Sequence, residues 1–301
     1  MRIFVLILLT FCAAAWADEP PVEIKATRLA DSVYMLQGQG GNMGLSVGPG
    51  GAVLIDDEFA PLSDKIKAAI AKVSQNPVRF LINTHWHGDH TGGNENFAKG
   101  GVVIVAQDNV RERMSSQQFI RAFNKKVPPS PPTALPIVTF NDTVTFHLNG
   151  DELHVFHVAH AHTDGDSIIY FRKHNVLHMG DTFFNQLYPF IDLSTGGSID
   201  GMIAAVDRAL PLTDSKTRII PGHGPLGDRA TLLKYRDMLK TVRDRIQAGI
   251  EAGKTLAQVQ AEHPSAEWDA VWGQDFIKPD AFVAEIYASL KNSHSKIPQH
   301  G

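Results

Sequence analysis

Residues 84–93 read Thr84-His85-Trp86-His87-Gly88-Asp89-His90-Thr91-Gly92-Gly93, which places three imidazoles and one carboxylate within six residues. The preceding stretch, residues 78–83, is mainly apolar and ends in an asparagine, so it predicts a buried strand that runs into a loop. A loop at the tip of a rigid strand can aim several side chains at one point. Surface histidines gathered by chance would not be this dense, and three more candidate ligands follow downstream.

Those three candidates each follow an apolar run that predicts a strand. They are His162, Asp181 and His223. Because strand ends can meet at one edge of a sheet, we expect these side chains to converge with the first four. Seven nitrogen and oxygen donors without a thiolate exceed what one tetrahedral zinc ion needs. Two metal ions close together fit this set better, and such pairs activate water for attack on a carbonyl or phosphoryl group.

In order and spacing, these residues resemble the metallo-β-lactamase superfamily, over roughly residues 27–238. The resemblance implies an α/β fold, a four-layer αβ/βα sandwich with two zinc ions (Zn²⁺) at one edge of its sheets. The first ion would be held by three imidazoles, those of His85, His87 and His162. The second would be held by Asp89, His90 and His223. Asp181 would bridge the two ions or bind the second alone.

Within that superfamily, residues 181–233 are most similar to the β-lactamases that use a cysteine ligand, as in Pro221-Gly222-His223-Gly224. Two positions depart from that pattern. Asp181 replaces the cysteine, as in the glyoxalase II and lactonase branches. Phe184 stands where those enzymes usually have a lysine that pairs with the drug's carboxylate. Loss of such a charge-assisted contact weakens binding by about 1.5–3 kcal/mol.

The expected activity is zinc-dependent hydrolysis of a small-molecule substrate. Zinc lowers the pKa of a bound water toward about 7, and Asp89 is the expected catalytic carboxylate that orients or deprotonates this water. We expect cleavage of a cyclic amide or ester, β-lactams included. The alternatives are a thioester or lactone hydrolase of the glyoxalase II type, and a metal-binding accessory protein without turnover. Asp89 argues against the last, since a binding module needs no such carboxylate. The donor types also suit manganese and iron.

Residues 1–17 predict a signal peptide that directs export to the periplasm. Arg2 gives a positive start, residues 3–11 form an apolar core, and residues 15–17 form a small-x-small cleavage site. A membrane anchor is the alternative, but the apolar core is shorter than the ~20 residues that span a bilayer. The bulky residue before Cys12 argues against a lipidated cysteine. We therefore expect cleavage after residue 17 and no stable membrane anchor.

Composition limits the partners of the mature chain. Cleavage would remove the only cysteine, so we expect neither a disulfide nor a cysteine nucleophile. It would also make the formal net charge, −4 for the full chain, slightly more negative. This mild acidity gives no electrostatic case for nucleic acid or anionic membranes, so a nuclease is the weakest candidate. We predict a metallo-β-lactamase-like domain over residues 18–250 and a helical C-terminal extension over 251–301.

Hydrophobic periodicity predicts alternating strands and helices. Strands are expected at residues 33–36, 43–47, 52–56, 78–83, 102–105, 138–147 and 153–159. Helices are expected at residues 64–73, 92–97, 108–123 and 199–210, in a long segment capped by Asp228, and within 255–290. Residues 127–132, rich in proline, predict an extended connector that neither continues a helix nor pairs in a sheet. Trp268 and Trp272 are expected to pack against the body of the protein.

Several features leave alternatives open. The glycine-rich residues 38–42 predict a hairpin turn, or a mobile substrate flap if the resemblance holds, and no helix follows them to support a phosphate cradle. His160 lies two residues before His162 and is expected outside the ligand set. Thr91 and Asp166 are expected to fix imidazole tautomers. The aromatic residues after Asp181 line the substrate site or fill the core: Phe183, Phe184, Tyr188 and Phe190.

Overall fold

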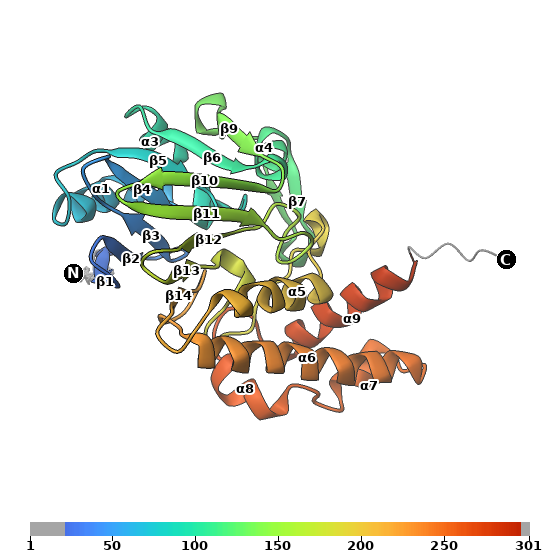
Figure 1. The fold of residues 1–301 in the computed structure, drawn as a ribbon. Helices are drawn as coiled ribbons and strands as arrows, with labels where there is room; N and C mark the ends of the chain where they lie inside the picture. The colour runs from blue at the N-terminus through green and yellow to red at the C-terminus, as the bar shows by residue number, and fades with distance from the viewer. Residues whose placement is uncertain (1–21, 296–301) are drawn as a thin grey trace, which may run out of the picture.

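Two β-sheets stack face to face in the computed structural model, which describes residues 22–295, and helices cover their outer faces (Figure 1). The predicted signal peptide, residues 1–17, lies outside the described residues. Within residues 22–295, no helix has the length and apolar character that a membrane crossing requires.

The first sheet has seven strands, whose spatial order follows the sequence. They are β1 (Lys25–Arg28), β2 (Val33–Gln37), β3 (Met43–Ser46), β4 (Ala52–Ile55), β5 (Val78–Ile82), β6 (Val103–Gln107) and β9 (Val138–Phe140). Strands β1 to β4 form an antiparallel meander, and β4, β5, β6 and β9 pair in parallel. The parallel strands are joined through α1 (Ser63–Ala71), α2 (Gly88–Thr91), α3 (Asn94–Ala98) and α4 (Asp108–Ser115).

The second sheet has five strands. They are β10 (Thr143–Leu148), β11 (Asp151–His157), β12 (Ser167–Phe171), β13 (Val176–His178) and β14 (Arg218–Ile220). Pairing is antiparallel from β10 to β13, and β14 lies parallel to β13. The later helices are α5 (Ile199–Ala209), α6 (Arg229–Glu251), α7 (Leu256–Gln260), α8 (Ala266–Trp272) and α9 (Pro279–Ser295). Shorter elements are the hairpin β7 (Gln118–Ile120) and β8 (Lys125–Val127), and six 3-10 helices: η1 (Ala60–Leu62), η2 (Arg121–Phe123), η3 (Pro132–Ala134), η4 (Gly180–Thr182), η5 (Leu193–Thr195) and η6 (Leu210–Leu212).

Three hydrophobic clusters separate four layers. One cluster joins α1 and α3 to the outer face of the first sheet, with Ile66 and Phe97 among its members. A second lies between the two sheets and includes Ile82 and Ile169. The third joins the second sheet to α5, α6 and α9. Because each sheet buries both of its faces, the chain forms the four-layer αβ/βα sandwich that the resemblance implies.

Helix α6 begins where the sequence predicts. The Asp228 carboxylate accepts a hydrogen bond from the backbone N–H of Thr231 (2.8 Å), and the Thr231 hydroxyl accepts one from the backbone N–H of Asp228 (2.8 Å). This reciprocal pair satisfies two N–H groups that the first turn leaves without a partner, and such caps contribute about 1 kcal/mol. The predicted apolar face is buried, with Leu232, Leu239 and Val242 fully enclosed.

Three predicted elements are wrong in part. The predicted helix 108–123 ends at Ser115, because Ser116 takes an extended conformation and Gln118 starts the hairpin of β7 and β8. The hairpin also includes Val127, the first residue of the predicted connector. The predicted strand 138–147 is two strands, β9 in the first sheet and β10 in the second. The chain crosses between the sheets at Asn141 and Asp142, two polar, turn-forming residues that the predicted strand ran across.

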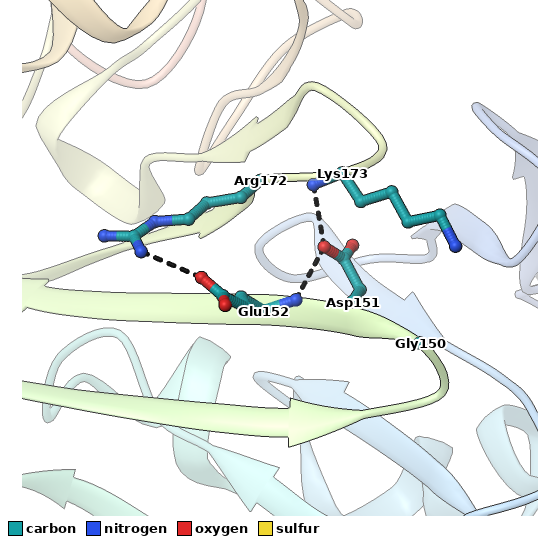
Figure 2. Close-up of a pocket in the computed structure, with 5 residues that line it drawn as sticks. All are labelled: Gly150, Asp151, Glu152, Arg172 and Lys173. Carbon is teal, nitrogen blue, oxygen red and sulfur yellow. Dashed lines mark hydrogen bonds and ion pairs between the residues drawn. The ribbon is translucent and has the colours of Figure 1, made fainter.

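At the end of the strands opposite to the predicted ligands, a hydrogen-bonded chain ties the two sheets together. The two ring nitrogens of His174 lie 2.5 Å from Asp151 Oδ2 and 3.1 Å from Ser32 Oγ. Asp151 Oδ1 also accepts the backbone N–H groups of Glu152 and Lys173 (Figure 2). An open pocket of about 450 Å³ lies beside this network and far from the predicted ligands, lined by Gly150, Asp151, Glu152, Arg172 and Lys173.

Candidate metal centre

All seven predicted ligand side chains meet at one edge of the two sheets. Each lies just beyond a strand or in a short helix that follows one. His85 and His87 follow β5, Asp89 and His90 lie in α2, and the remaining three follow β11, β13 and β14: His162, Asp181 and His223. The backbone of each strand is fixed by its ladder, so these side chains start from rigid positions.

The first group of side chains contains His85, His87 and His162. All three are buried, and their candidate ligand atoms lie within 4.8 Å of one another. His87 Nδ1 lies 2.8 Å from His162 Nε2. His85 Nε2 is buried without a hydrogen-bond partner. Such an orphaned nitrogen in a native structure calls for an ion or another partner, so this group fits a metal ion.

The second group contains Asp89, His90 and His223. Asp89 Oδ2 lies 3.2 Å from His223 Nε2 and 3.6 Å from His90 Nε2. The two imidazole nitrogens lie 3.4 Å apart. Three donor atoms therefore surround a second point, and their types suit zinc.

Asp181 lies between the two groups. Its Oδ1 lies 3.1 Å from His90 Nε2, and its Oδ2 lies 3.4 Å from His223 Nε2. Oδ2 is also 3.5 Å from His162 Nε2 and 3.8 Å from His85 Nε2. One carboxylate thus contacts members of both groups, which is the position that a shared ligand would occupy.

Burial and charge set the protonation states of the cluster. Burial lowers the pKa of His85 well below its usual value and that of His162 to about 4, so both rings favour the neutral form that binds metal ions. Burial alone would raise the pKa of Asp181, but the imidazoles of His90 and His223 hold it well below its usual range. Asp181 in turn raises the pKa of His223 to about 9, against the effect of burial. The second group therefore favours positive charge, whether from protons or from a metal ion.

Four of the five imidazoles are oriented by an oxygen on the ring nitrogen that faces away from the cluster. His85 Nδ1 lies 3.0 Å from Thr84 Oγ1 and His87 Nε2 lies 3.1 Å from Asp192 Oδ2. His90 Nδ1 lies 2.8 Å from Asp56 Oδ2. His162 Nδ1 lies 2.8 Å from the carbonyl oxygen of Phe190. Outer partners of this kind fix the tautomer of a metal-binding imidazole and leave its other nitrogen free to bind.

Asp56 is an orienting residue that sequence reasoning missed. It is fully buried at the end of β4 and accepts hydrogen bonds from the backbone N–H and the hydroxyl of Thr84, both at 2.7 Å. It also contacts His90, so one carboxylate orients two imidazoles, one of them through Thr84. The available signal was the run of three acidic residues, 56–58, at the end of an apolar strand.

The prediction that Thr91 and Asp166 fix imidazole tautomers is wrong. The Thr91 hydroxyl donates to the backbone carbonyl oxygens of Trp86 and His87. Asp166 accepts hydrogen bonds from the backbone N–H and the hydroxyl of Thr163. Both side chains therefore hold the backbone of ligand-bearing loops, and the imidazole partners come from segments more distant in sequence.

His160 and His162 occupy different environments. His160 lies at the surface, with Nδ1 3.1 Å from the carbonyl oxygen of Gly196. His162 is fully buried in the first group. The structure therefore brings His162, and not His160, into the cluster.

The glycine-rich loop 38–42 packs directly on the second group. Gly41 N–H donates to the carbonyl oxygen of Asp89 (3.1 Å), and Asn42 N–H donates to that of Gly222 (2.7 Å). A Cβ atom on Gly41 would lie 2.1 Å from His90 Cε1, so only glycine fits against this imidazole. The loop borders the centre, as the resemblance implies.

The four aromatic residues after Asp181 divide between the two predicted roles. Phe183 and Tyr188 fill the core, where they contact Tyr235 and Phe282. Phe184 stacks on the ring of His223, with centroids 5.3 Å apart. The ring of Phe190 contacts the rings of His87 and His162 in the first group. Two of the four thus form an apolar wall beside the cluster.

A family model for the metallo-beta-lactamase superfamily matches residues 36–232, about two thirds of the chain. The chain belongs to this superfamily. Superfamily members are metal-dependent hydrolases. The cluster of histidine and aspartate side chains at the sheet edge could hold the metal ions that such hydrolases need.

Similar proteins act on different substrates. A metallo-beta-lactamase type 2 of Bacteroides fragilis is 24% identical over 238 residues, which cover 75% of this chain and 90% of the relative. A hydroxyacylglutathione hydrolase of Nitrosococcus oceani is 26% identical over 217 residues, which cover 72% of this chain and 70% of the relative. A stereoselective inverting sec-alkylsulfatase from Pseudomonas sp. has a similar fold, with a TM-score of 0.65 and 18% identity over 88% of this chain and 50% of that one.

Proposed function

We propose that this superfamily hydrolase is an exported two-zinc enzyme that cleaves an ester or amide bond, cyclic substrates such as β-lactams included. The single observation that carries the proposal is the position of Asp181 between two groups of three donors. A carboxylate shared by two such groups supports two ions rather than one, and paired ions are used where water attacks an activated carbonyl.

Each residue of the cluster has a role under this proposal. His85, His87 and His162 would hold the first ion, and Asp89, His90 and His223 the second, with Asp181 shared. When bound, the ions supply a water of lowered pKa and polarise the substrate carbonyl. Asp89 accepts the proton of the attacking water, because its side chain is the more exposed carboxylate, 30% against 5% for Asp181. Phe184 and Phe190 enclose the reacting groups on the apolar side and exclude water.

The wall formed by Phe184 bears on substrate choice. An aromatic ring stacked on His223 offers no cation to a substrate carboxylate. We therefore expect esters and amides without a carboxylate beside the scissile bond to be better substrates than anionic β-lactams. Thioesters and lactones are the second candidate class, favoured by the Asp181 ligand and by the similarity to a hydroxyacylglutathione hydrolase.

The test is a turnover screen of the zinc-loaded mature protein with nitrocefin, a set of acyl lactones and S-lactoylglutathione. We expect hydrolysis of at least one compound, loss of activity on chelation, and recovery when zinc is added back. Elemental analysis of the same preparation should give two metal ions per chain. One ion per chain, or stoichiometric zinc without turnover of any compound, would contradict the proposal and favour a metal-binding accessory role.

A further inference from the structure

A row of aromatic rings extends from the first ligand group to the protein surface. Phe190 lies against the rings of His87 and His162, with centroids 5.9 and 5.7 Å away. Phe123 follows at 4.8 Å from Phe190, and Phe276 at 5.1 Å from Phe123. Each ring contacts the next, so the row is continuous. We call these three phenylalanines the aromatic ridge.

The ridge becomes more exposed with distance from the cluster. The exposed fraction is 6% for Phe190, 41% for Phe123 and 68% for Phe276. Full exposure of a large aromatic ring is unfavourable in water, because its apolar area remains hydrated. A row of exposed apolar rings that starts at candidate catalytic groups marks a surface for contact with an apolar ligand.

Three separate segments contribute to the ridge. Phe190 belongs to the loop that follows Asp181, Phe123 to η2 in the hairpin of β7 and β8, and Phe276 to the link between α8 and α9. Phe276 lies outside the residues matched by the family model, 36–232. The link between α8 and α9 therefore supplies one end of the ridge.

Contacts with α8 and α9 hold two of the three ridge segments in place. The Ile191 N–H donates to Glu285 of α9 (3.0 Å), next to Phe190 in the chain. The Tyr188 ring stacks on Phe282 of α9, with centroids 4.3 Å apart, and its hydroxyl donates to Asp269 of α8 (2.7 Å). The Phe190 loop and the two helices that flank Phe276 are thus joined. A surface fixed in this way loses little conformational entropy when a ligand binds.

We propose that the aromatic ridge binds the apolar chain of the substrate, so that the enzyme prefers esters or amides with a long alkyl or aryl group. This inference rests on the proposed hydrolase function. The ridge meets the cluster on the side of His87 and His162. A substrate whose carbonyl lies at the cluster would therefore extend its apolar chain over Phe190 toward Phe276. The exposed rings of the ridge are then the specificity-determining residues.

The first test measures binding rather than turnover, with straight-chain hydroxamic acids from acetohydroxamic to decanohydroxamic acid as probes. Their head group chelates zinc and their chain cannot be hydrolysed away. Titration calorimetry on the zinc-loaded protein should show tighter binding with length, by up to about fourfold per methylene that reaches the ridge. The Phe276→Ala variant should bind decanohydroxamic acid about tenfold more weakly than the parent and acetohydroxamic acid equally well. Val271→Ala, another exposed apolar position at 57%, is the control and should change neither.

The second probe is 1-octanol, which has no chelating head, so its binding does not depend on zinc. We expect it to bind the parent protein more tightly than the Phe276→Ala variant. Affinities that do not depend on chain length, or a loss on Phe276→Ala that is equal for short and long chains, would overturn the inference. So would a dimer, seen by sedimentation, that Phe276→Ala dissociates. If the ridge binds the alkyl probes but the turnover screen finds no substrate, the hydrolase proposal is wrong, whereas the assignment of the ridge as an apolar binding site is retained.

Discussion

Asp89 and Asp181 lie in the same cluster but have different surroundings, which separates their roles at the scale of single residues. Asp181 is almost fully buried among four imidazoles, whereas Asp89 is partly exposed and contacts His90 and His223. A bridging ligand needs enclosure, and a proton acceptor needs access to water and substrate. The geometry therefore favours Asp89 as the catalytic carboxylate.

Asp89→Asn keeps the size of the side chain but removes its charge and its capacity to accept a proton. We expect turnover at saturating zinc to fall by about 10²–10⁴, the usual contribution of general-base catalysis. Excess zinc should restore metal occupancy but not activity. His160→Ala is the matched control, since His160 lies at the surface and outside the cluster, and should be mild. Activity within about threefold of the parent for Asp89→Asn, with loss for His160→Ala, would show that the ligand assignment is wrong.

Asp56 acts on the cluster without belonging to it. Asp56→Asn places an amide N–H₂ among three donors, so at least one of Thr84 N–H, Thr84 hydroxyl and His90 loses its acceptor. We expect zinc affinity to fall about 10–100-fold, as for other outer partners of metal ligands. Competition with a chromophoric chelator measures this.

The control for that variant is Asp57→Asn. Asp57 is equally buried and accepts a hydrogen bond from the Gly93 N–H, on the backbone rather than on an imidazole. The zinc affinity of the Asp57→Asn variant should stay within a few-fold of that of the parent protein. Equal losses in both variants would mean that Asp56 acts through general stability and not through the imidazoles.

The seven candidate ligands could be predicted from sequence because four of them lie in one short motif and two more, Asp181 and His223, lie directly beside glycines, where spacing is informative. Their orienting partners could not. Asp56 is 34 positions from His90, and Asp192 is 105 positions from His87. Only the packing of strands brings these carboxylates to the rings, and no local pattern records that proximity.

At the scale of secondary-structure elements, the loop 38–42 connects the first meander to the centre. It packs on α2 through the Gly41 hydrogen bond to Asp89, and Glu58 accepts the N–H of Gln39 (3.1 Å). The loop conformation is thus set by partners on two other segments. Sequence reasoning could predict a turn here, but could not show that its glycines are required for contact with an imidazole.

Gly41→Ala tests that contact. The new Cβ would overlap the His90 ring, which is fully buried and cannot move away without loss of its contacts. We expect the second zinc ion to bind at least tenfold more weakly, measured by metal content after dialysis at a fixed free-zinc level. Gly88→Ala, in the central motif but with open space around its Cβ position, is the matched control and should retain both ions. Full retention of zinc by Gly41→Ala would show that the loop moves aside.

The error over residues 108–123 has a physical origin. The stripe over residues 108–123 has helical spacing, yet after Ser115 only Ile120 is buried among its large apolar members, while Phe119 and Phe123 are exposed. Periodicity assumes that every apolar residue faces a core. The exposed rings of Phe119 and Phe123 break that assumption.

At the scale of the whole molecule, the four-layer order could be predicted only through the resemblance of the ligand motifs to the superfamily, because hydrophobic periodicity indicates strands and helices but not how they stack. The role of the C-terminal helices could not. Helices α7 to α9 share a hydrophobic cluster with α6 and fix the Phe190 loop, which residue spacing alone does not indicate. The proposed division at residue 250 stays a prediction.

The export proposal also concerns the whole chain. The small-x-small pattern at residues 15–17 leads us to expect cleavage after Ala17 when the full-length chain is expressed in a bacterial host. Intact-mass measurement of protein from the periplasmic fraction should give a chain that starts at Asp18. A protein that keeps Met1, or that starts at another residue, would contradict this boundary.

Glu285 links α9 to the Phe190 loop and should make stability depend on pH. Burial raises its pKa to about 8, more than the hydrogen bond from Ile191 lowers it. The folded state therefore holds a proton that the unfolded chain, with a glutamate pKa of ~4.3, releases. Between these two pKa values the folded state binds more protons, so its free energy of unfolding falls as pH rises, by at most about 1.4 kcal/mol per pH unit.

Glu285→Gln keeps an oxygen acceptor for the Ile191 N–H but cannot ionise. We expect the variant to be more stable than the parent at pH 9 by a few kcal/mol and about equal at pH 4. Urea unfolding of both proteins across this range measures the difference. Glu112→Gln, at an exposed position on α4, is the control and should show no such trend. A difference between Glu285→Gln and the parent that does not grow with pH would mean that Glu285 is ionised in the folded state, and that the junction between α9 and the Phe190 loop is open to water.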